Sequence, residues 1–278
     1  MALYSDGRYK EAEELFVQVM EMSKRVLGEE HPDTLLSMGN LASTYRNQGR
    51  WKEAEELSVQ VMETRKREAE ELFVQVMETR KRVVGEEHPD TLLSMGNLAS
   101  TYRNQGRWKE AEELEVQVME TRKRVLGEEH PDTLTSMGNL ASTFWNQGRW
   151  KEAEELFVQV METSSRVLGE EHPSTLRSMG NLASTYRNQG RWKEAEELEV
   201  QVMEARKRVL GEEHPDTLLS ISNFAFTLQT QARQKEAFAL MERCFLLRQQ
   251  ILGEQHPDTQ SSLDTLASWR ADCSDELS

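Results

Sequence analysis

Apolar residues recur along this chain at helical spacing, in two alternating kinds of stretch. The first kind carries one apolar stripe at intervals of three and four residues, as at Leu35, Met38, Leu41, Ala42 and Tyr45. The second kind follows a few residues later with a stripe at Trp51, Ala54, Leu57 and Val61. No segment alternates with the period of two that a half-buried strand needs. The pattern therefore predicts an all-α protein built from pairs of helices.

Residues at the ends of these stretches predict where the helices begin and end. Pro32 suits a first helical turn, where its missing N–H costs nothing, and Asp33 complements the helix dipole there. Gly49 predicts a left-handed cap between the two helices of a pair, and Gly127 predicts the end of a second helix. Each pair is thus expected to form a helix–turn–helix unit.

The pairs repeat along the chain. Four of the five spacings between successive His-Pro dipeptides are 42 residues, and one is 57. These dipeptides begin at His31, His88, His130, His172, His214 and His256. Tandem similarity at such a period is typical of a solenoid, in which each unit buries its apolar face against its neighbours. Near-identical units leave no place for a unique catalytic cluster, so the sequence argues against an enzyme.

The sequence Leu41-Ala42-x-x-Tyr45, followed by Gly49 and Ala54, resembles the tetratricopeptide repeat (TPR) signature. The longer period, together with the segment LGEEHPDT, resembles the 42-residue TPR variant of kinesin light chains. Arrays of near-identical copies also resemble the C-terminal sensor regions of fungal NLR-like proteins of the nucleotide-binding STAND class. The resemblance implies a right-handed α-solenoid in which residues 1–278 form a single array.

A duplication of 15 residues explains the spacing of 57. Residues 53–67 read EAEELSVQVMETRKR, and residues 68–82 repeat them with one change. Neither glycine nor proline separates the two copies, so the sequence predicts one irregular long helix from about Trp51 to Arg82. We expect it to divide the array into sub-blocks 1–67 and 68–278. Gene-level slippage without function and a selected hinge both account for the duplication.

The two ends of the chain differ from the regular copies. Residues 5–12 match a turn and the start of a second helix, so the chain opens inside a repeat. A fragment of a longer protein and an array without an N-terminal cap both fit this start. The second possibility would expose apolar surface and favour end-to-end self-association. Towards the C-terminus Ala232 replaces the turn glycine, and Gln234 replaces tryptophan.

Composition restricts the partners and the compartment. The net charge of −15 argues against nucleic acid, which needs a basic face. No apolar run is long enough for a membrane span, and the first residues lack a signal-peptide core. Cys244 and Cys273 have no metal-ligand spacing, so we expect a reduced, cytoplasmic compartment, with Cys244 in the core. Each Glu-Glu-His-Pro-Asp loop offers one imidazole, so neither a metal nor another cofactor is expected.

The first helix of each pair has a polar face, which the TPR resemblance identifies as a concave, peptide-binding wall. One asparagine per copy lies on it, at Asn40, Asn97, Asn139, Asn181 and Asn223. An asparagine side chain both donates and accepts, so it can pair with a peptide backbone. Small neighbours leave room for a peptide, at Gly39, Gly96, Gly138, Gly180, Ser43, Ser100, Ser142 and Ser184. Alternatively, each asparagine bonds the neighbouring repeat and each glycine permits close helix packing.

Two more positions on this wall differ between copies. One position holds Arg46, Arg103, Trp145, Arg187 and Gln229. The other holds Leu36, Leu93, Thr135, Arg177 and Leu219. The arginines form either a basic stripe suited to carboxylates and phosphates or ion pairs with glutamates of the repeat. Variation within a constant frame fits a recognition surface, and neutral drift produces the same pattern.

The sequence therefore predicts a protein–protein interaction scaffold that binds an extended, acidic peptide on its concave face. The NLR-like resemblance would make it the ligand-sensing region of an intracellular receptor. A kinesin-light-chain-like cargo adaptor is the alternative within the same class. A structural or self-associating rod without a ligand is the alternative outside it.

Overall fold

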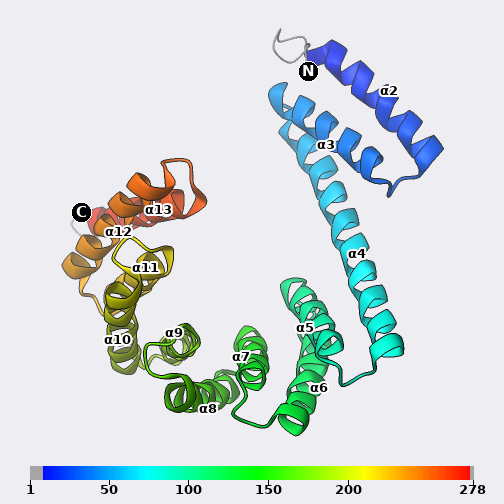
Figure 1. Ribbon diagram of the computed structural model, residues 1–278. Coiled ribbons are helices and arrows are strands. Elements are labelled where there is room, and N and C mark those ends of the chain that lie inside the picture. The colour runs from blue at the N-terminus through cyan, green and yellow to red at the C-terminus, as the bar shows by residue number, and fades with distance from the viewer. Residues whose placement is uncertain (1–8, 276–278) are drawn as a thin grey trace. The chain divides into compact units, whose positions relative to one another are not determined.

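The computed structural model describes residues 9–275, and within this range twelve helices follow one another without a strand (Figure 1). The first helices of the pairs are α3 (Pro32–Asn47), α5 (Pro89–Asn104), α7 (Pro131–Asn146), α9 (Pro173–Asn188), α11 (Pro215–Thr230) and α13 (Pro257–Asp275). The second helices are α2 (Tyr9–Leu27), α4 (Trp51–Val84), α6 (Trp108–Leu126), α8 (Trp150–Leu168), α10 (Trp192–Leu210) and α12 (Gln234–Leu252). The predicted all-α class is confirmed.

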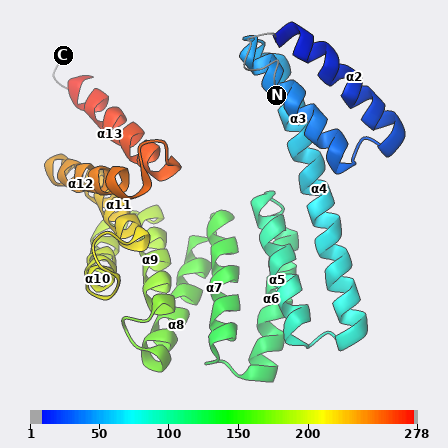
Figure 2. The same ribbon diagram turned by 45° about the horizontal axis from the view of Figure 1, so that its top comes forward.

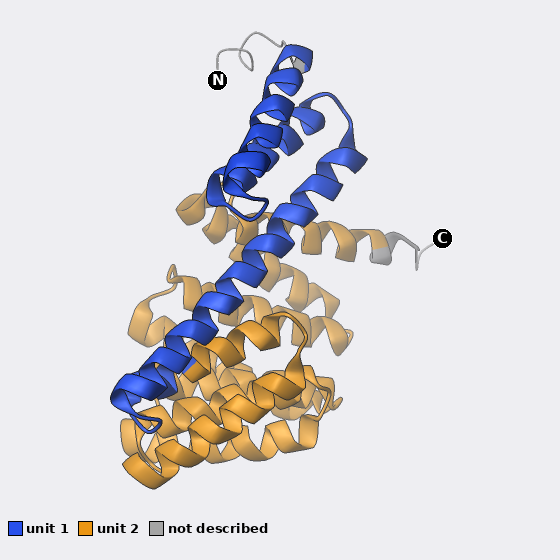
Figure 3. Ribbon diagram, turned by 90° about the vertical axis from the view of Figure 1, so that its right-hand side faces the viewer, with its two compact units in different colours: residues 1–94 blue, residues 95–278 orange. Residues whose placement is uncertain are grey.

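The chain divides into two compact units, residues 1–94 and residues 95–278 (Figure 3). In the first unit α4 crosses the duplication as a single helix of 34 residues, so the predicted long helix is confirmed. Its buried side chains are Ala54 and Val61 in the first half and Met77 in the second. An insertion of about 4.2 turns rotates the second apolar stripe by about 60° from the first. The sub-block boundary expected between residues 67 and 68 stays a prediction.

A histidine caps the start of each first helix. His130 Nδ1 accepts a hydrogen bond from the backbone N–H of Asp132 at 3.2 Å, and Pro131 follows as the first helical residue. The same contact recurs at His31, His88, His172, His214 and His256. Because the imidazole satisfies an N–H that the helix leaves free, the repeated histidine stabilises the helix entry.

Left-handed glycines end the helices as predicted. Gly49 has φ 76° in the turn between α3 and α4, and Ala232 adopts φ 60° in the turn between α11 and α12. Gly127, after α6, has φ 96° and ψ 162°, a backbone conformation that a side chain would strain. Its carbonyl accepts a hydrogen bond from Thr133 Oγ1 at 2.9 Å, which ties the loop to the next first helix.

The apolar stripes form the cores between adjacent helices. Leu35, Met38 and Leu41 of α3 are at most 2% exposed. Cys244 of α12 is fully buried, so its predicted place in the core is confirmed. The predicted burial of Trp51 is wrong, because this side chain is 66% exposed. Trp51 is the first residue of α4, one turn before the stripe meets the partner helix at Ala54.

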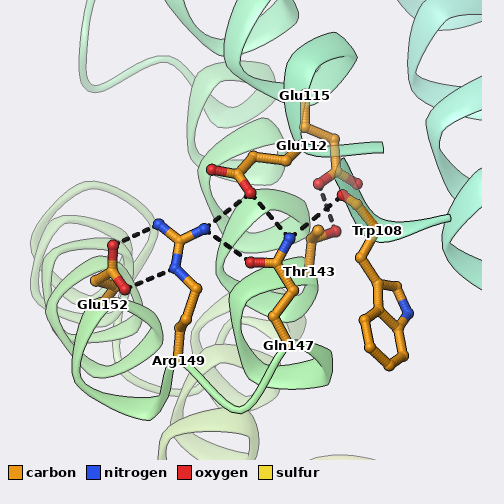
Figure 4. Close-up of polar contacts among 7 residues, drawn as sticks. All are labelled: Trp108, Glu112, Glu115, Thr143, Gln147, Arg149 and Glu152. Atoms are coloured by element: carbon orange, nitrogen blue, oxygen red, sulfur yellow. Dashed lines mark hydrogen bonds and ion pairs between the residues drawn. The ribbon is translucent and has the colours of Figure 1, made fainter. Parts of the chain in front are cut away.

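A polar clamp joins consecutive repeats in residues 95–278 (Figure 4). Arg149, between α7 and α8, donates from Nη1 to Glu112 Oε2 of α6 at 2.8 Å and from Nε to Glu152 Oε2 of α8 at 2.7 Å. Its guanidinium carbon lies 4.0 Å from the ring centroid of Phe144. Gln147 Nε2 also donates to Glu112 Oε2, at 2.8 Å. Many charges of the repeat therefore connect one repeat to the next.

Candidate functional site

Four of the predicted peptide-binding residues surround one cavity between α7 and α9, which both ribbon views show as neighbours (Figures 1 and 2). The cavity has a volume of about 140 Å³. Its lining includes Thr135 and Asn139 from α7, and Arg177 and Asn181 from α9. Thr135 and Arg177 are exposed, whereas the two asparagines are half-buried. The structure thus brings side chains from two repeats to a single place on the wall.

A missing arginine explains this cavity. In the next copy Arg206 of α10 donates from Nη1 to the backbone oxygen of Asp216 at 2.9 Å and to Ser220 Oγ at 2.8 Å. The same bridge to the following first helix is made by Arg80, Arg122 and Arg248. In α8 the residue at this position is Ser164, which is fully buried and lines the cavity. Ser164 Oγ has no hydrogen-bond partner among the described residues.

A second cavity, of about 160 Å³, adjoins the first. The two share Ser142, Phe157 and Asn181, and Trp145 of α7 lines the second. Trp145 packs against the apolar cluster that contains Phe157. Trp145 Nε1 is buried and lacks a hydrogen-bond partner within residues 9–275. The wall therefore presents an aromatic surface beside a polar cavity.

Trp145 and Phe157 occupy two positions of their copy at which the preceding and the following copy have an ion pair. Arg103 Nη1 lies 3.4 Å from Glu115 Oε1, and Arg187 Nη1 lies 3.7 Å from Glu199 Oε1. Each carboxyl belongs to the second helix and is at most 5% exposed. Each arginine also donates to a backbone carbonyl of the following first helix, at 3.3 Å. Both guanidinium groups thus already contact a carboxyl and a carbonyl of the array. Binding of a peptide by these two arginines stays a prediction.

Burial changes the protonation of these carboxyls. It raises the pKa of Glu115, although Thr143 Oγ1 donates to Glu115 Oε2 at 2.6 Å (Figure 4). Burial also raises the pKa of Glu199 to about 7, because the side chain of Thr227 and the charge of Arg187 offset only part of the desolvation. Glu199 Oε2 has no hydrogen-bond partner in the described part of the chain. Glu199 therefore changes its charge near neutral pH.

The wall glycines are not required for packing within the chain. A Cβ added to Gly138 or Gly180 would meet no atom within 4 Å, and the same holds for Gly39 and Gly96. A glycine in a helix costs about 1 kcal/mol relative to alanine. The alternative that glycine permits close helix packing is therefore not supported at these positions. Of these glycines only Gly138 lines one of the two cavities.

The other predicted wall residues lie on first helices but are not part of either cavity. In α3 they are Leu36, Asn40 and Arg46; in α5, Leu93, Asn97 and Arg103; in α9, Arg187; and in α11, Leu219, Asn223 and Gln229. Among the predicted residues, only those of α7 and α9 line these two cavities.

Comparison with known families identifies the repeats. A tetratricopeptide repeat model matches residues 1–67, 65–123, 97–163 and 139–208, and a second one matches residues 217–258. The chain belongs to the tetratricopeptide repeat family. No curated protein is similar enough to this TPR chain to count as a match.

Solved structures include relatives of this TPR chain. A crystal structure of a Podosopora anserina protein described as a kinesin light chain, with nearly identical TPR-like repeats, is 33% identical. The match covers 79% of this chain and 97% of that one, with a TM-score of 0.56. BtubC from P. vanneervenii is 19% identical over 90% of this chain and 94% of its own, with a TM-score of 0.54. The apo quorum sensor NprR from B. thuringiensis is 14% identical over 95% and 66%, also with a TM-score of 0.54. The last two show the fold alone.

In three consecutive copies two variable positions of the TPR unit change together, a signal that sequence reasoning missed; the copy with Arg46 departs from this pattern, because it carries Ser58. They lie 12 residues apart, on the first and the second helix of one pair. Copies with Arg103 and Arg187 carry glutamate at the second position, whereas the copy with Trp145 carries Phe157. The coupling is visible in the sequence, but its meaning depends on the contact between the two helices.

Two further properties concern the TPR chain as a whole. No helix within residues 9–275 is long and apolar enough to cross a membrane. Within the described residues, no three histidine, cysteine or carboxylate side chains gather in a way that could hold a metal ion. The side chain of Cys273 lies outside the described residues.

Proposed function

We propose that this TPR protein binds an extended peptide segment of a partner protein along the wall of α7 and α9. The supporting observation is where the copies differ. Relative to residues 89–130, the next two copies carry nine substitutions. Six line the two wall cavities: Thr135, Trp145, Phe157, Ser164, Ser174 and Arg177. Two more, Ser165 and Ala205, line a separate cavity between α8 and α10, and only Phe144 lines none of the three.

The positions of these nine substitutions test whether neutral drift alone explains the differences between the copies, an alternative that the sequence left open. Fewer than half of the residues in these two copies line the three cavities. Substitutions without function would spread over the whole solvated surface of the array. At Ser164, Ser165 and Ala205 the shorter side chain itself opens the cavity, so the support for a recognition surface set in a constant frame comes from Thr135, Trp145, Phe157, Ser174 and Arg177.

The chemistry of the wall suits a peptide whose backbone is bound by the asparagines and of which two side chains are recognised. The amides of Asn139 and Asn181 can each donate to and accept from a peptide group. Trp145 offers an aromatic surface for one apolar side chain. Arg177 has no ion-pair partner within the described residues, and its guanidinium suits a carboxylate. The acidic preference therefore rests on Arg177.

The biological setting is a further part of the proposal. The identity of 33% with a kinesin-light-chain-like relative supports a cargo or partner adaptor. The resemblance of near-identical copies to NLR-like sensor regions supports a ligand-sensing role in an intracellular receptor. Both settings need the same peptide-binding wall, so one experiment on the wall applies to either.

A selection from a random peptide library tests the proposal, with the full chain as bait at low and at physiological salt. Arg177→Leu introduces the leucine that two other copies have at this position, at Leu93 and Leu219, so the variant should fold. Trp145→Arg combined with Phe157→Glu restores the ion pair of the neighbouring copies. We expect each variant to weaken the selected peptides by about tenfold or more. We also expect Arg177→Leu to remove the salt dependence.

A matched control places a similar change on the same wall but away from the cavities. Leu219→Thr, in the next copy, should leave peptide affinity unchanged. The double variant Asn139→Ala and Asn181→Ala should lose affinity for every selected peptide, because it removes backbone contacts. If no peptide is selected, or if the selected peptides bind the restored variants as tightly as the original chain, the proposal is refuted.

A further inference from the structure

A larger cavity lies between α8 and α10, on residues that the peptide wall does not use. Its volume is about 830 Å³, and it shares no lining residue with the two wall cavities. Apolar side chains from three helices line it, including Met161 of α8, Met179 of α9 and Leu198 of α10. Cavities of roughly 300–1,000 Å³ with mainly apolar linings are typical of sites for small molecules.

Two substitutions coincide with this cavity. Lysine occupies the position of Ser165 in the neighbouring copies, at Lys123 and Lys207. Threonine occupies the position of Ala205 in the preceding copies, at Thr121 and Thr163. Both replacements shorten side chains that line the cavity.

The core is correspondingly more open here than in the preceding copy. Met137 is 1% exposed and Met119 is 7% exposed. Their counterparts, Met179 and Met161, are only partly buried, and both line the cavity. Methionine side chains are flexible and polarisable, so they adapt to apolar ligands of different shape. These two core methionines are therefore accessible to a molecule bound in the cavity.

The charged residues around the cavity indicate which charge a bound molecule would carry. Arg208 is paired with Glu171, at 2.5 Å from Nη2 to Oε1. Arg166 is paired with Glu129, outside the cavity, at 2.9 Å. Two other carboxylates of the lining, Glu162 and Glu170, have no ion-pair partner within residues 9–275. An apolar interior bordered by two unpaired carboxylates is complementary to a cation and repels an anion.

We propose that this cavity binds a small organic cation with an apolar body. The apolar body covers Met161 and Met179, and removal of their surface from water supplies most of the affinity. The cationic group lies at the edge, where it faces Glu162 and Glu170 and keeps contact with water. The site is independent of the peptide wall, because the two share no residue.

Calorimetric titration of the full chain with phenylbutylammonium tests the proposal, with phenylbutyrate as an anion of the same shape. The filled variant combines Ser165→Lys with Ala205→Thr. Both changes restore residues of sister copies, so the fold should persist. We expect one equivalent of the amine to bind the original chain. The filled variant should bind it at least tenfold more weakly, and phenylbutyrate should not bind.

A gain-of-site variant provides the matched control. Lys123→Ser with Thr163→Ala removes the corresponding side chains between α6 and α8, where Glu120 and Glu128 stand at the equivalent positions. This variant should bind two equivalents of the amine. Arg177→Leu, which alters only the peptide wall, should bind the amine as the original chain does.

Three results would overturn the proposal. They are absence of binding at millimolar amine, equal binding by the filled variant, and equal binding of phenylbutyrate. Loss of amine binding in Arg177→Leu would also overturn it, because the site would then belong to the wall. Failure of peptide selection leaves these outcomes unaffected, so the two proposals fail separately.

Discussion

The buried carboxyl of Glu199 should make the stability of residues 95–278 depend on pH. Burial raises its pKa from the ordinary 4.5 to about 7, so the folded chain binds this proton more tightly than the unfolded chain. The contribution of Glu199 to the free energy of unfolding is therefore fully present below pH 4.5 and is lost as pH rises through about 7. At about 1.4 kcal/mol per pH unit, the loss amounts to about 3 kcal/mol.

Urea unfolding at pH 5 and pH 8 measures this loss, with Glu199→Gln as the test variant. Because glutamine cannot ionise, we expect the free energy of unfolding of Glu199→Gln, measured relative to that of the original chain, to rise by about 2.5 kcal/mol from pH 5 to pH 8. Repeat arrays often unfold in parts, so hydrogen exchange of the α10 amides should locate the effect. Glu197→Gln, at an exposed site on the same helix, is the matched control and should keep the original pH dependence.

The result that would refute this reasoning is specific. If Glu199→Gln keeps the full pH dependence of the original chain, Glu199 does not take up a proton on folding. In that case Arg187, 3.7 Å from the carboxylate, and Thr227 must offset the desolvation of Glu199 in full. A loss of pH dependence in the Glu197→Gln control would equally show that the effect does not come from burial.

Three further substitutions test other parts of the structure by urea unfolding at pH 7. Gly138→Ala adds a Cβ that meets no atom within 4 Å, so stability should rise by about 1 kcal/mol; a loss would mean that the glycine has a packing role. Ala232→Gly relieves a backbone held at φ 60° and should stabilise by about 1 kcal/mol, whereas an unchanged midpoint would indicate no strain there. Arg149→Ala removes the clamp to Glu112 and the contact with Phe144 and should destabilise by about 1 kcal/mol; Arg149→Lys should recover only part, because lysine lacks the planar fork.

Much of the fold was predictable because its signals are local. Proline, glycine and the apolar stripes act within one or two turns, so helix ends such as Pro32 and Gly49 follow from neighbouring residues alone. The continuous helix α4 was predictable for the same reason, since no residue in the duplication interrupts it. Trp51 was misplaced because its burial depends on where the partner helix passes, which periodicity does not reveal.

The candidate site was predictable only in part. The Asn and Arg positions on the wall follow from helical geometry, and the structure gathers Asn139, Asn181 and Arg177 at one cavity. Whether an arginine side chain forms an ion pair does not follow from its position on the helix. Arg103 and Arg187 reach buried glutamates on the second helix, a contact between residues that lie 12 positions apart in the chain.

By itself, the sequence determined the class, the order and the ends of the helices and the period of the array, because each depends on interactions within a few residues. The tertiary structure alone decided which polar groups remain available and where space is left. Ser164 shows why: a serine in place of arginine is a small change along the chain. Its consequence, a cavity with an unpartnered hydroxyl, exists only where α8 packs against α7 and α9. Cavities and buried charges arise from packing between helices, which local residue signals do not specify.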